Sequence, residues 1–129
     1  MSVGTPETSS VVLVVEDDAL LRLDAADQLE DAGFEVVQAA NAAQALQVMK
    51  SRPDVGVLFT DVEMPGPLDG MELARKVHEQ WPNVLLLITS GSKRPAKADI
   101  ADHGHFLAKP YRTQEVIQEI AALAREAER

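Results

Sequence analysis

Short apolar runs alternate along the chain with segments whose apolar residues recur at helical spacing. The runs occupy residues 11–15, 34–38, 55–60, 84–89 and 105–108, and the first of them, VVLVV, is typical of a strand buried on both faces. The helical stripes comprise Leu21, Ala25, Leu29 and Ala32; Ala42, Ala45, Leu46 and Met49; Leu73, Ala74, Val77 and Trp81; and Val116, Ile117, Ile120, Leu123 and Ala124. The pattern therefore predicts strands that alternate with amphipathic helices.

Residues with capping preferences support the predicted helix bounds. Asp18, Asn41 and Asp69 stand where a helix N-cap is expected, and Gly33 stands where a helix C-terminus favours glycine. Alternating strands and helices predict an α/β fold, a doubly wound five-stranded parallel sheet with helices on both faces. The 16 residues 90–105 hold a proline and few large apolar side chains, so a helix between the last two strands is expected to be short or irregular.

Acidic and polar residues collect where the predicted strands end. They are Glu16, Asp17 and Asp18 after the first strand, Asp61 after the third, Thr89 and Ser90 after the fourth, and Lys109 after the fifth. In an open parallel sheet the carboxyl ends of the strands lie along one edge, and ligands bind there where the strand order reverses. These carboxylates, hydroxyls and one ammonium group are therefore expected to share a shallow cleft.

Such a cleft favours a particular chemistry. Crowded carboxylates repel one another unless a cation neutralises them, and a site with only oxygen ligands suits Mg²⁺ better than Zn²⁺. A lysine can pair with a phosphate oxygen, and an aspartate among these groups can be the nucleophile that takes a phosphoryl group. Little else is needed, because phosphoryl transfer depends mostly on positioning and charge stabilisation.

Composition narrows the possible classes of protein. The 129 residues, 46% of them hydrophobic, fit one compact domain, and no apolar run approaches the roughly 20 residues of a membrane span. A net charge of −9 argues against binding to nucleic acid or to an anionic membrane surface. There are no cysteines, so disulfides and thiolate sites are excluded. Residues 1–10 lack the features of a signal peptide and are expected to be a disordered lead, and a cytoplasmic location is expected.

Four motifs resemble those of the receiver domains of two-component response regulators. They are VVEDD at 14–18, DVEMPGPLDG at 61–70, ITS at 88–90 and KP at 109–110. Each motif alone is a weak signal, but four in the right order, each at a strand end, are specific. The resemblance implies a receiver domain over residues 11–129, a flavodoxin-like strand order 2-1-3-4-5 and a monomer or weak homodimer.

The resemblance also implies how the phosphorylation site is built. Asp61 matches the phosphoacceptor of the family. Asp17 matches a direct Mg²⁺ ligand, and Glu16 matches a residue that acts on the ion through water. Asp61 itself and the backbone carbonyl of Glu63 match the remaining protein ligands. The phosphodonor would be a sensor histidine kinase or a phosphotransfer protein.

Three further residues match the parts of the family that respond to phosphorylation. Thr89 matches the switch hydroxyl, Lys109 the lysine that pairs with the phosphoryl group, and Phe106 the switch aromatic position, which is often tyrosine. The Lys109–Pro110 peptide bond matches one that is cis in the family. The resemblance implies a signalling switch with only Mg²⁺-dependent self-phosphorylation and autodephosphorylation, not an enzyme with a separate substrate.

The sequence departs from the family pattern in ways that affect the expected output. The loop M-P-G-P-L-D-G is one residue longer than the common M-P-x-M-D-G, and Gly91 is expected to leave open space near the phosphoryl site. Phe106 has no hydroxyl and can signal only through packing. The chain ends at Arg129, shortly after the last predicted helix, so we expect no attached output domain. The downstream target is unknown, and output is expected by protein contact or by a phosphate relay or sink.

Three other functions fit parts of the pattern less well. An aspartate-nucleophile phosphohydrolase uses similar residues, but its typical D-x-D is absent because residue 63 is glutamate. An interaction module that cannot be phosphorylated is disfavoured by the intact acidic pair with Thr89 and Lys109. Nucleotide binding is weakest, because no glycine-rich phosphate loop follows the first strand. The three histidines, at positions 78, 103 and 105, are expected to be surface or loop residues.

Overall fold

The computed structural model describes residues 11–64, 66–91 and 104–127, which form one sheet of parallel strands with helices on both faces. In chain order the strands are β1 (Val11–Val15), β2 (Glu35–Ala39), β3 (Val55–Asp61), β4 (Leu85–Ser90) and β5 (Gly104–Ala108). Across the sheet the order is β2-β1-β3-β4-β5. The predicted doubly wound α/β fold, with strand order 2-1-3-4-5, is therefore confirmed.

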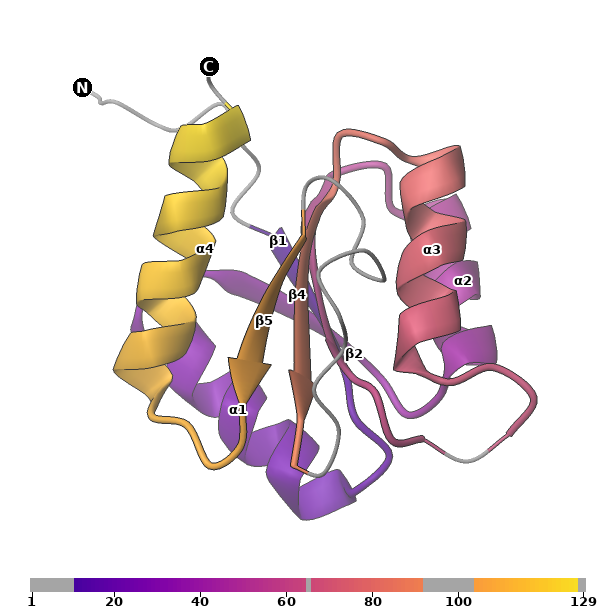
Figure 1. The fold of residues 1–129 in the computed structure, drawn as a ribbon. Coiled ribbons are helices and arrows are strands. Elements are labelled where there is room, and N and C mark those ends of the chain that lie inside the picture. The colour runs from indigo at the N-terminus through magenta and orange to yellow at the C-terminus, as the bar shows by residue number, and fades with distance from the viewer. Residues whose placement is uncertain (1–10, 65, 92–103, 128–129) are drawn as a thin grey trace.

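The described helices form two layers around this sheet. They are α1 (Ala19–Asp31), α2 (Ala42–Ser51), α3 (Gly70–Gln80) and α4 (Thr113–Ala127). Figure 1 shows α1 and α4 on one face of the sheet and α2 and α3 on the other. Alternate residues of β1 enter the two cores: Val12 and Val14 pack with the first pair of helices, and Leu13 and Val15 pack with the second pair. The run VVLVV is continuously apolar because both faces are covered.

The predicted caps begin the first three helices. The side chains of Asp18, Asn41 and Asp69 each accept hydrogen bonds from backbone N–H groups in the first turn of α1, α2 and α3 respectively. Gly33 follows α1 with a φ of 102°, a left-handed conformation that glycine adopts without strain. These local signals fix where each helix begins, and therefore which residues stand in the turns at the carboxyl ends of β1 and β3.

The buried face of α1 differs from the one that the sequence predicts. Leu21 and Ala32 were expected to face the core, but both are exposed, and the buried residues of α1 are Ala26 and Leu29. The leucines at 20, 21 and 23, in the first turns of this helix, are each about half exposed or more. The result is an apolar surface at the N-terminal end of α1.

Several other bounds differ from expectation by one residue. β2 and β4 begin and end one residue later than predicted, and β3 extends to include Asp61. Two expectations, the disordered lead at 1–10 and the short helix between Thr89 and Phe106, fall on residues outside the described ranges. Within those ranges, no helix combines the length and apolar content needed to cross a membrane.

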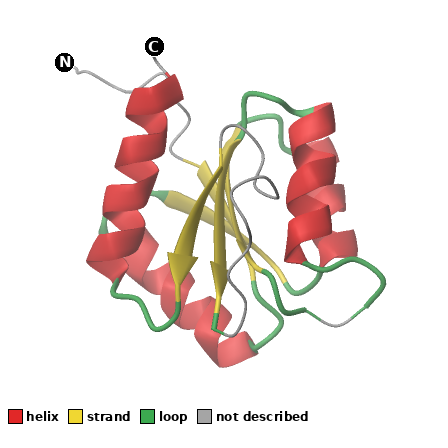
Figure 2. Ribbon diagram, viewed as in Figure 1, coloured by secondary structure: helices red, strands yellow, loops and turns green. Residues whose placement is uncertain are grey.

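The carboxyl ends of the strands lie at a single edge of the sheet. Figure 2 shows the strand arrows of β4 and β5 ending at the same level, each followed by a loop. The order reverses between β1 and β3, which are neighbours although β2 lies between them in sequence. Ligand sites in open α/β sheets form at such a reversal, and the candidate residues of the sequence analysis stand there.

Candidate functional site

Three carboxylates meet at this edge of the sheet. Asp61 is the last residue of β3 and is buried, while Glu16 and Asp17 lie in the turn between β1 and α1. One carboxylate oxygen from each residue lies within 4.8 Å of the other two. Mg²⁺ binds through carboxylates and keeps several water ligands. The donor set therefore fits such a cation, with the exposed Asp17 on the solvent side.

The backbone N–H, the backbone carbonyl and the carboxylate of Glu16 all have contacts that fix its position. Its backbone N–H donates to the carbonyl of Ala39 at 3.1 Å, and its own carbonyl accepts from the Arg22 guanidinium at 2.8 Å. Its carboxylate accepts from the backbone N–H of Asp18 at 3.1 Å and lies 3.6 Å from Lys109 Nζ. Burial raises the pKa of the Glu16 carboxyl, while the Asp18 N–H and the Lys109 charge oppose that shift.

Lys109 supplies a cation opposite the carboxylates. It follows β5, and its Nζ donates to Asp61 Oδ2 at 3.0 Å. Burial by itself lowers the pKa of Lys109, but the hydrogen bond to Asp61 and the charges of Asp61 and Glu16 leave this pKa raised. The ammonium group is therefore kept charged beside the Asp61 carboxylate. The Lys109–Pro110 bond is cis, as the resemblance implies.

Thr89 lies beside Asp61 on the neighbouring strand and carries an unsatisfied hydroxyl. The two residues are register partners across β3 and β4. Thr89 Oγ1 is buried and has no hydrogen-bond partner among the residues that the structure describes. A small void of about 10 Å³, lined by both residues among others, lies at this point. Buried hydroxyl groups normally find a partner, so this one is suited to bind a group that arrives at the site.

Glu63 connects the loop after β3 with the end of β4. Its carboxylate accepts a short hydrogen bond from the Ser90 hydroxyl and a longer one, 3.3 Å, from the backbone N–H of Gly91. Its own backbone N–H donates to Asp61 Oδ1 at 3.3 Å. The side chain of Glu63 is therefore engaged at the end of β4, while its backbone N–H lies close to the Asp61 carboxylate.

Gly70 packs closely against the backbone of Asp61. It is the first residue of α3, and its N–H donates to the carbonyl of Val62 at 3.0 Å. A Cβ at this position would lie 2.0 Å from the carbonyl oxygen of Asp61. Only glycine permits this contact, which holds the start of α3 against the end of β3. Gly91 differs, because among the described residues a Cβ there would meet the Lys109 side chain alone, at 3.8 Å.

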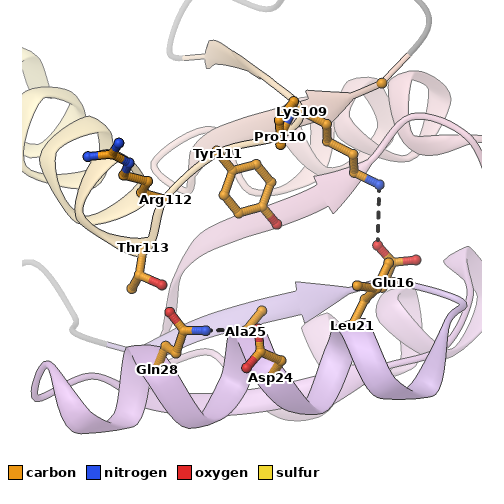
Figure 3. Close-up of a pocket in the computed structure, with 11 residues that line it drawn as sticks. Glu16, Leu21, Asp24, Ala25, Gln28, Lys109, Pro110, Tyr111, Arg112 and Thr113 are labelled. Carbon is orange, nitrogen blue, oxygen red and sulfur yellow. Dashed lines mark hydrogen bonds and ion pairs between the residues drawn. The ribbon is translucent and has the colours of Figure 1, made fainter.

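An open cavity of about 730 Å³ leads to the site between α1 and the segment after β5. Figure 3 shows Tyr111 in its centre, with the hydroxyl directed toward the side where Glu16 and Leu21 lie. The Tyr111 ring packs edge-on against Phe59, and burial raises the pKa of its hydroxyl. Lys109 and Glu16 form one end of the cavity wall. A ligand, or a side chain of another protein, can therefore approach the carboxylates through this cavity.

The structure brings the expected site residues together with one exception. Glu16, Asp17, Asp61, Thr89 and Lys109 share the edge, but Phe106 is half-buried and packs against the core beneath α2 and α3. Sequence reasoning missed four features: the closeness of Gly70, the cavity residue Tyr111, the Arg22 contact, and His105.

His105 was expected to be a surface or loop residue; its side chain is partly exposed, but it stands in a strand and not in a loop. It lies in β5, with Nδ1 2.7 Å from Glu119 and Nε2 3.0 Å from Glu126 of α4. Burial lowers the pKa of His105, but the hydrogen bonds to the two glutamates outweigh it and leave this pKa raised.

Comparisons with known proteins agree with this geometry. A model of the response regulator receiver domain matches residues 12–121. The response regulator receiver protein CpdR of Brucella abortus is 31% identical over 112 residues, which are 84% of this chain and 92% of that protein. A crystal structure of a response regulator receiver protein from Sinorhizobium medicae has a TM-score of 0.78 at 29% identity, covering 91% of this chain and 95% of that one.

Other relatives are much longer than this chain. The CAI-1 autoinducer sensor kinase/phosphatase CqsS of Vibrio cholerae is 29% identical over 86% of this chain, which spans only 17% of that protein. The transcriptional regulatory protein PdtaR of Mycobacterium tuberculosis is 30% identical over 84% of this chain, or 54% of its own length. The chain thus corresponds to one module that occurs both alone and within larger signalling proteins.

Proposed function

The chain belongs to the response regulator receiver domain family, and we propose that it is a phosphorylation-dependent signalling switch whose phosphoacceptor is Asp61. One observation carries this proposal: the buried Asp61 carboxylate lies with the carboxylates of Glu16 and Asp17 and is hydrogen-bonded to Lys109 at 3.0 Å. This combination of a nucleophile, an ammonium group and an acidic pair is suited to phosphoryl transfer.

The phosphoryl group would come from a phosphohistidine of a sensor histidine kinase or a phosphotransfer protein. A carboxylate oxygen of Asp61 attacks phosphorus, the new O–P bond forms, and the N–P bond of the donor breaks. The donor imidazole leaves with the bonding electron pair and takes up a proton. Return to the resting state needs water, which attacks phosphorus, breaks the O–P bond and releases inorganic phosphate and the Asp61 carboxylate.

Mg²⁺ is the proposed cofactor. Asp17, Asp61 and the backbone carbonyl of Glu63 would hold it, and Glu16 would act through water. When bound, the ion supplies charge neutralisation for the phosphoryl oxygens. Lys109 already pairs with Asp61 in the resting protein, so its ammonium group needs only a small movement to pair with a phosphoryl oxygen.

Thr89 and Phe106 are proposed to carry the change away from the acceptor. A phosphoryl group adds about −1.5 to −2 charges and three acceptor oxygens. The buried Thr89 hydroxyl, which has no partner within the described residues, can donate to one of these oxygens. Movement of Thr89 alters the space beside β5, and Phe106, its near neighbour in the β4–β5 register, would repack in response.

The N-terminal end of α1 is the proposed docking surface for the phosphodonor. Leu20, Leu21 and Leu23 are exposed there, and Leu21 also lines the cavity that leads to Glu16 and Lys109. An exposed apolar patch next to a site favours a protein partner. The similarity to a region of a sensor kinase/phosphatase supports a partner from the same signalling class.

Intact mass after incubation with acetyl phosphate and Mg²⁺ tests the proposal. Wild-type protein should gain one phosphoryl group, and the gain should disappear when Mg²⁺ is chelated or when Asp61 is replaced by asparagine. The matched control is Asp54→Asn, which changes an exposed aspartate just before β3, at the end of that strand opposite Asp61. No adduct in wild type, together with no beryllofluoride complex in the presence of Mg²⁺, would refute the proposal. Rapid turnover of p-nitrophenyl phosphate would instead favour a phosphohydrolase.

A further inference from the structure

Arg22 reaches from α1 back to the turn that carries the acidic pair. Its Nη1 donates to the backbone carbonyl of Glu16 at 2.8 Å, and its Nε donates to Gln38 Oε1 at 3.3 Å. One guanidinium group therefore ties together three segments: the first turn of α1, the turn after β1, and the end of β2. No part of the proposed phosphoryl transfer uses this contact.

The position of the Glu16 carbonyl explains why this contact matters. The ladder between β1 and β2 ends at the pair Val15–Ala39, and Glu16 adds one more bond through its N–H. The Glu16 carbonyl lies beyond that ladder, and Arg22 supplies its donor. Because a peptide unit is planar, fixing this carbonyl also fixes the direction in which the chain continues to Asp17.

We propose that Arg22 is a positioning residue for the cation site, which holds the peptide between Glu16 and Asp17 so that both carboxylates lie near Asp61. Gln38 serves the same purpose by orienting the guanidinium group through its Nε. The inference rests on the proposed function, since it concerns the affinity of that site for Mg²⁺. Partners behind the direct ligands of a metal typically change its affinity by about 10- to 100-fold when removed.

Electrostatics alone predicts the opposite change in Mg²⁺ affinity when Arg22 is removed. The Arg22 guanidinium is a positive charge next to a group of three carboxylates, so its removal should by itself favour a divalent cation. Positioning predicts weaker binding when the same side chain is removed. The direction of the change in Mg²⁺ affinity therefore separates the two explanations without any assumption about its size.

Titration calorimetry of Mg²⁺ on four proteins makes this comparison. Arg22→Ala should bind Mg²⁺ roughly tenfold more weakly than wild type. Gln38→Ala, which leaves the net charge unchanged, should bind roughly threefold more weakly, because Arg22 keeps its bond to Glu16 but loses the long hydrogen bond that orients its guanidinium group. Arg52→Ala is the matched control: this arginine pairs with Glu35 and Asp54 at 2.8 Å beside the amino ends of β2 and β3, and its loss should leave Mg²⁺ affinity unchanged.

A kinetic measurement distinguishes positioning from a general structural role. With acetyl phosphate as donor, Arg22→Ala should need about tenfold more Mg²⁺ for half-maximal phosphoryl uptake, yet reach the wild-type rate at saturating Mg²⁺. Thermal unfolding, measured in parallel, reports any loss of stability separately. A plateau rate that collapses in Arg22→Ala would show damage to the site as a whole and would overturn the inference.

The remaining outcomes also decide the question. Mg²⁺ binding by Arg22→Ala that equals or exceeds wild type would overturn the positioning role in favour of charge alone. If Arg22→Ala does not fold, Gln38→Ala carries the test, and wild-type affinity in that variant would overturn the inference. No Mg²⁺ binding by wild type would overturn the proposed function and this inference with it, so the two failures are distinct.

Discussion

Replacement of Gly70 by alanine should destabilise the fold and displace Asp61, the proposed phosphoacceptor. The new Cβ would lie 2.0 Å from the carbonyl oxygen of Asp61, 2.7 Å from its carbonyl carbon and 2.8 Å from the Cα of Val62. Ordinary contact begins at 3.4 Å, so the end of β3 and the start of α3 must separate by about 1.4 Å. All three atoms belong to the backbone, so no side chain can rotate away to relieve the contact.

The expected cost is at the upper end for an overpacked position, about 3 kcal/mol. For a domain of this size that corresponds to a fall in Tm of about 10 °C. Thermal unfolding followed by circular dichroism measures this value, and phosphoryl uptake from acetyl phosphate reports the position of Asp61. Uptake should fall sharply at temperatures where the variant is still folded, because the displaced residue, Asp61, is the proposed acceptor.

Two other glycines provide matched controls. Within the described part of the chain, the new Cβ of Gly91→Ala meets a flexible lysine side chain at 3.8 Å, so stability should change by less than about 0.5 kcal/mol. Gly33→Ala has open space but a φ of 102°, so it should cost about 1 kcal/mol and leave phosphoryl uptake intact. A Gly70→Ala protein with the stability and uptake of wild type would refute the close approach. Lost stability with normal uptake would refute the link to Asp61.

Three further changes test separate parts of the site and fold. Thr89→Val removes a buried hydroxyl that lacks a partner among the described residues, so unfolding experiments should show unchanged or raised stability, by about 1 kcal/mol, rather than the usual loss. Lys109→Met leaves Asp61 without its cation, and denaturant unfolding should show a loss of about 1–3 kcal/mol that added Mg²⁺ partly restores; an unchanged midpoint would contradict the ion pair. His105 has a raised pKa in the folded state, so its ion pairs stabilise the protein fully below its unfolded pKa of about 6.5 and are lost as pH rises through the folded value. Between pH 6 and pH 8 wild type should therefore lose up to about 1 kcal/mol relative to His105→Gln, and parallel pH profiles for the two proteins would contradict the role of its glutamate partners.

The part of the site that could be predicted follows from the geometry of parallel sheets. Asp61, Thr89 and Lys109 each stand at the end of an apolar run, and such ends meet at one edge wherever the strands are parallel. Glu16 and Asp17 are predictable for the same reason. The strand order itself could not be obtained from these patterns and came from the resemblance to a known family.

The features that sequence reasoning missed depend on contacts between distant elements. His105 precedes the apolar residues Phe106–Ala108 in β5, and nothing in the local sequence reveals that Glu119 and Glu126 of α4 contact its two ring nitrogens. The Arg22 contact depends on the rotation of α1, which the same reasoning misjudged when it placed Leu21 in the core. The need for glycine at position 70 comes from a backbone approach, which leaves no trace in hydrophobic periodicity.

The central proposal is that a phosphoryl group on Asp61 accepts a hydrogen bond from the Thr89 hydroxyl, and that the carboxyl-terminal ends of β4 and β5 move in response. Amide NMR spectra of wild type and Thr89→Val, recorded with Mg²⁺ before and after addition of beryllofluoride, test it most directly. In wild type the amide signals of Ser90, Gly91 and Phe106 should shift on addition. In Thr89→Val the shifts should stay confined to the loop around Asp61. Equal shifts in both proteins, or none in wild type, would contradict the account.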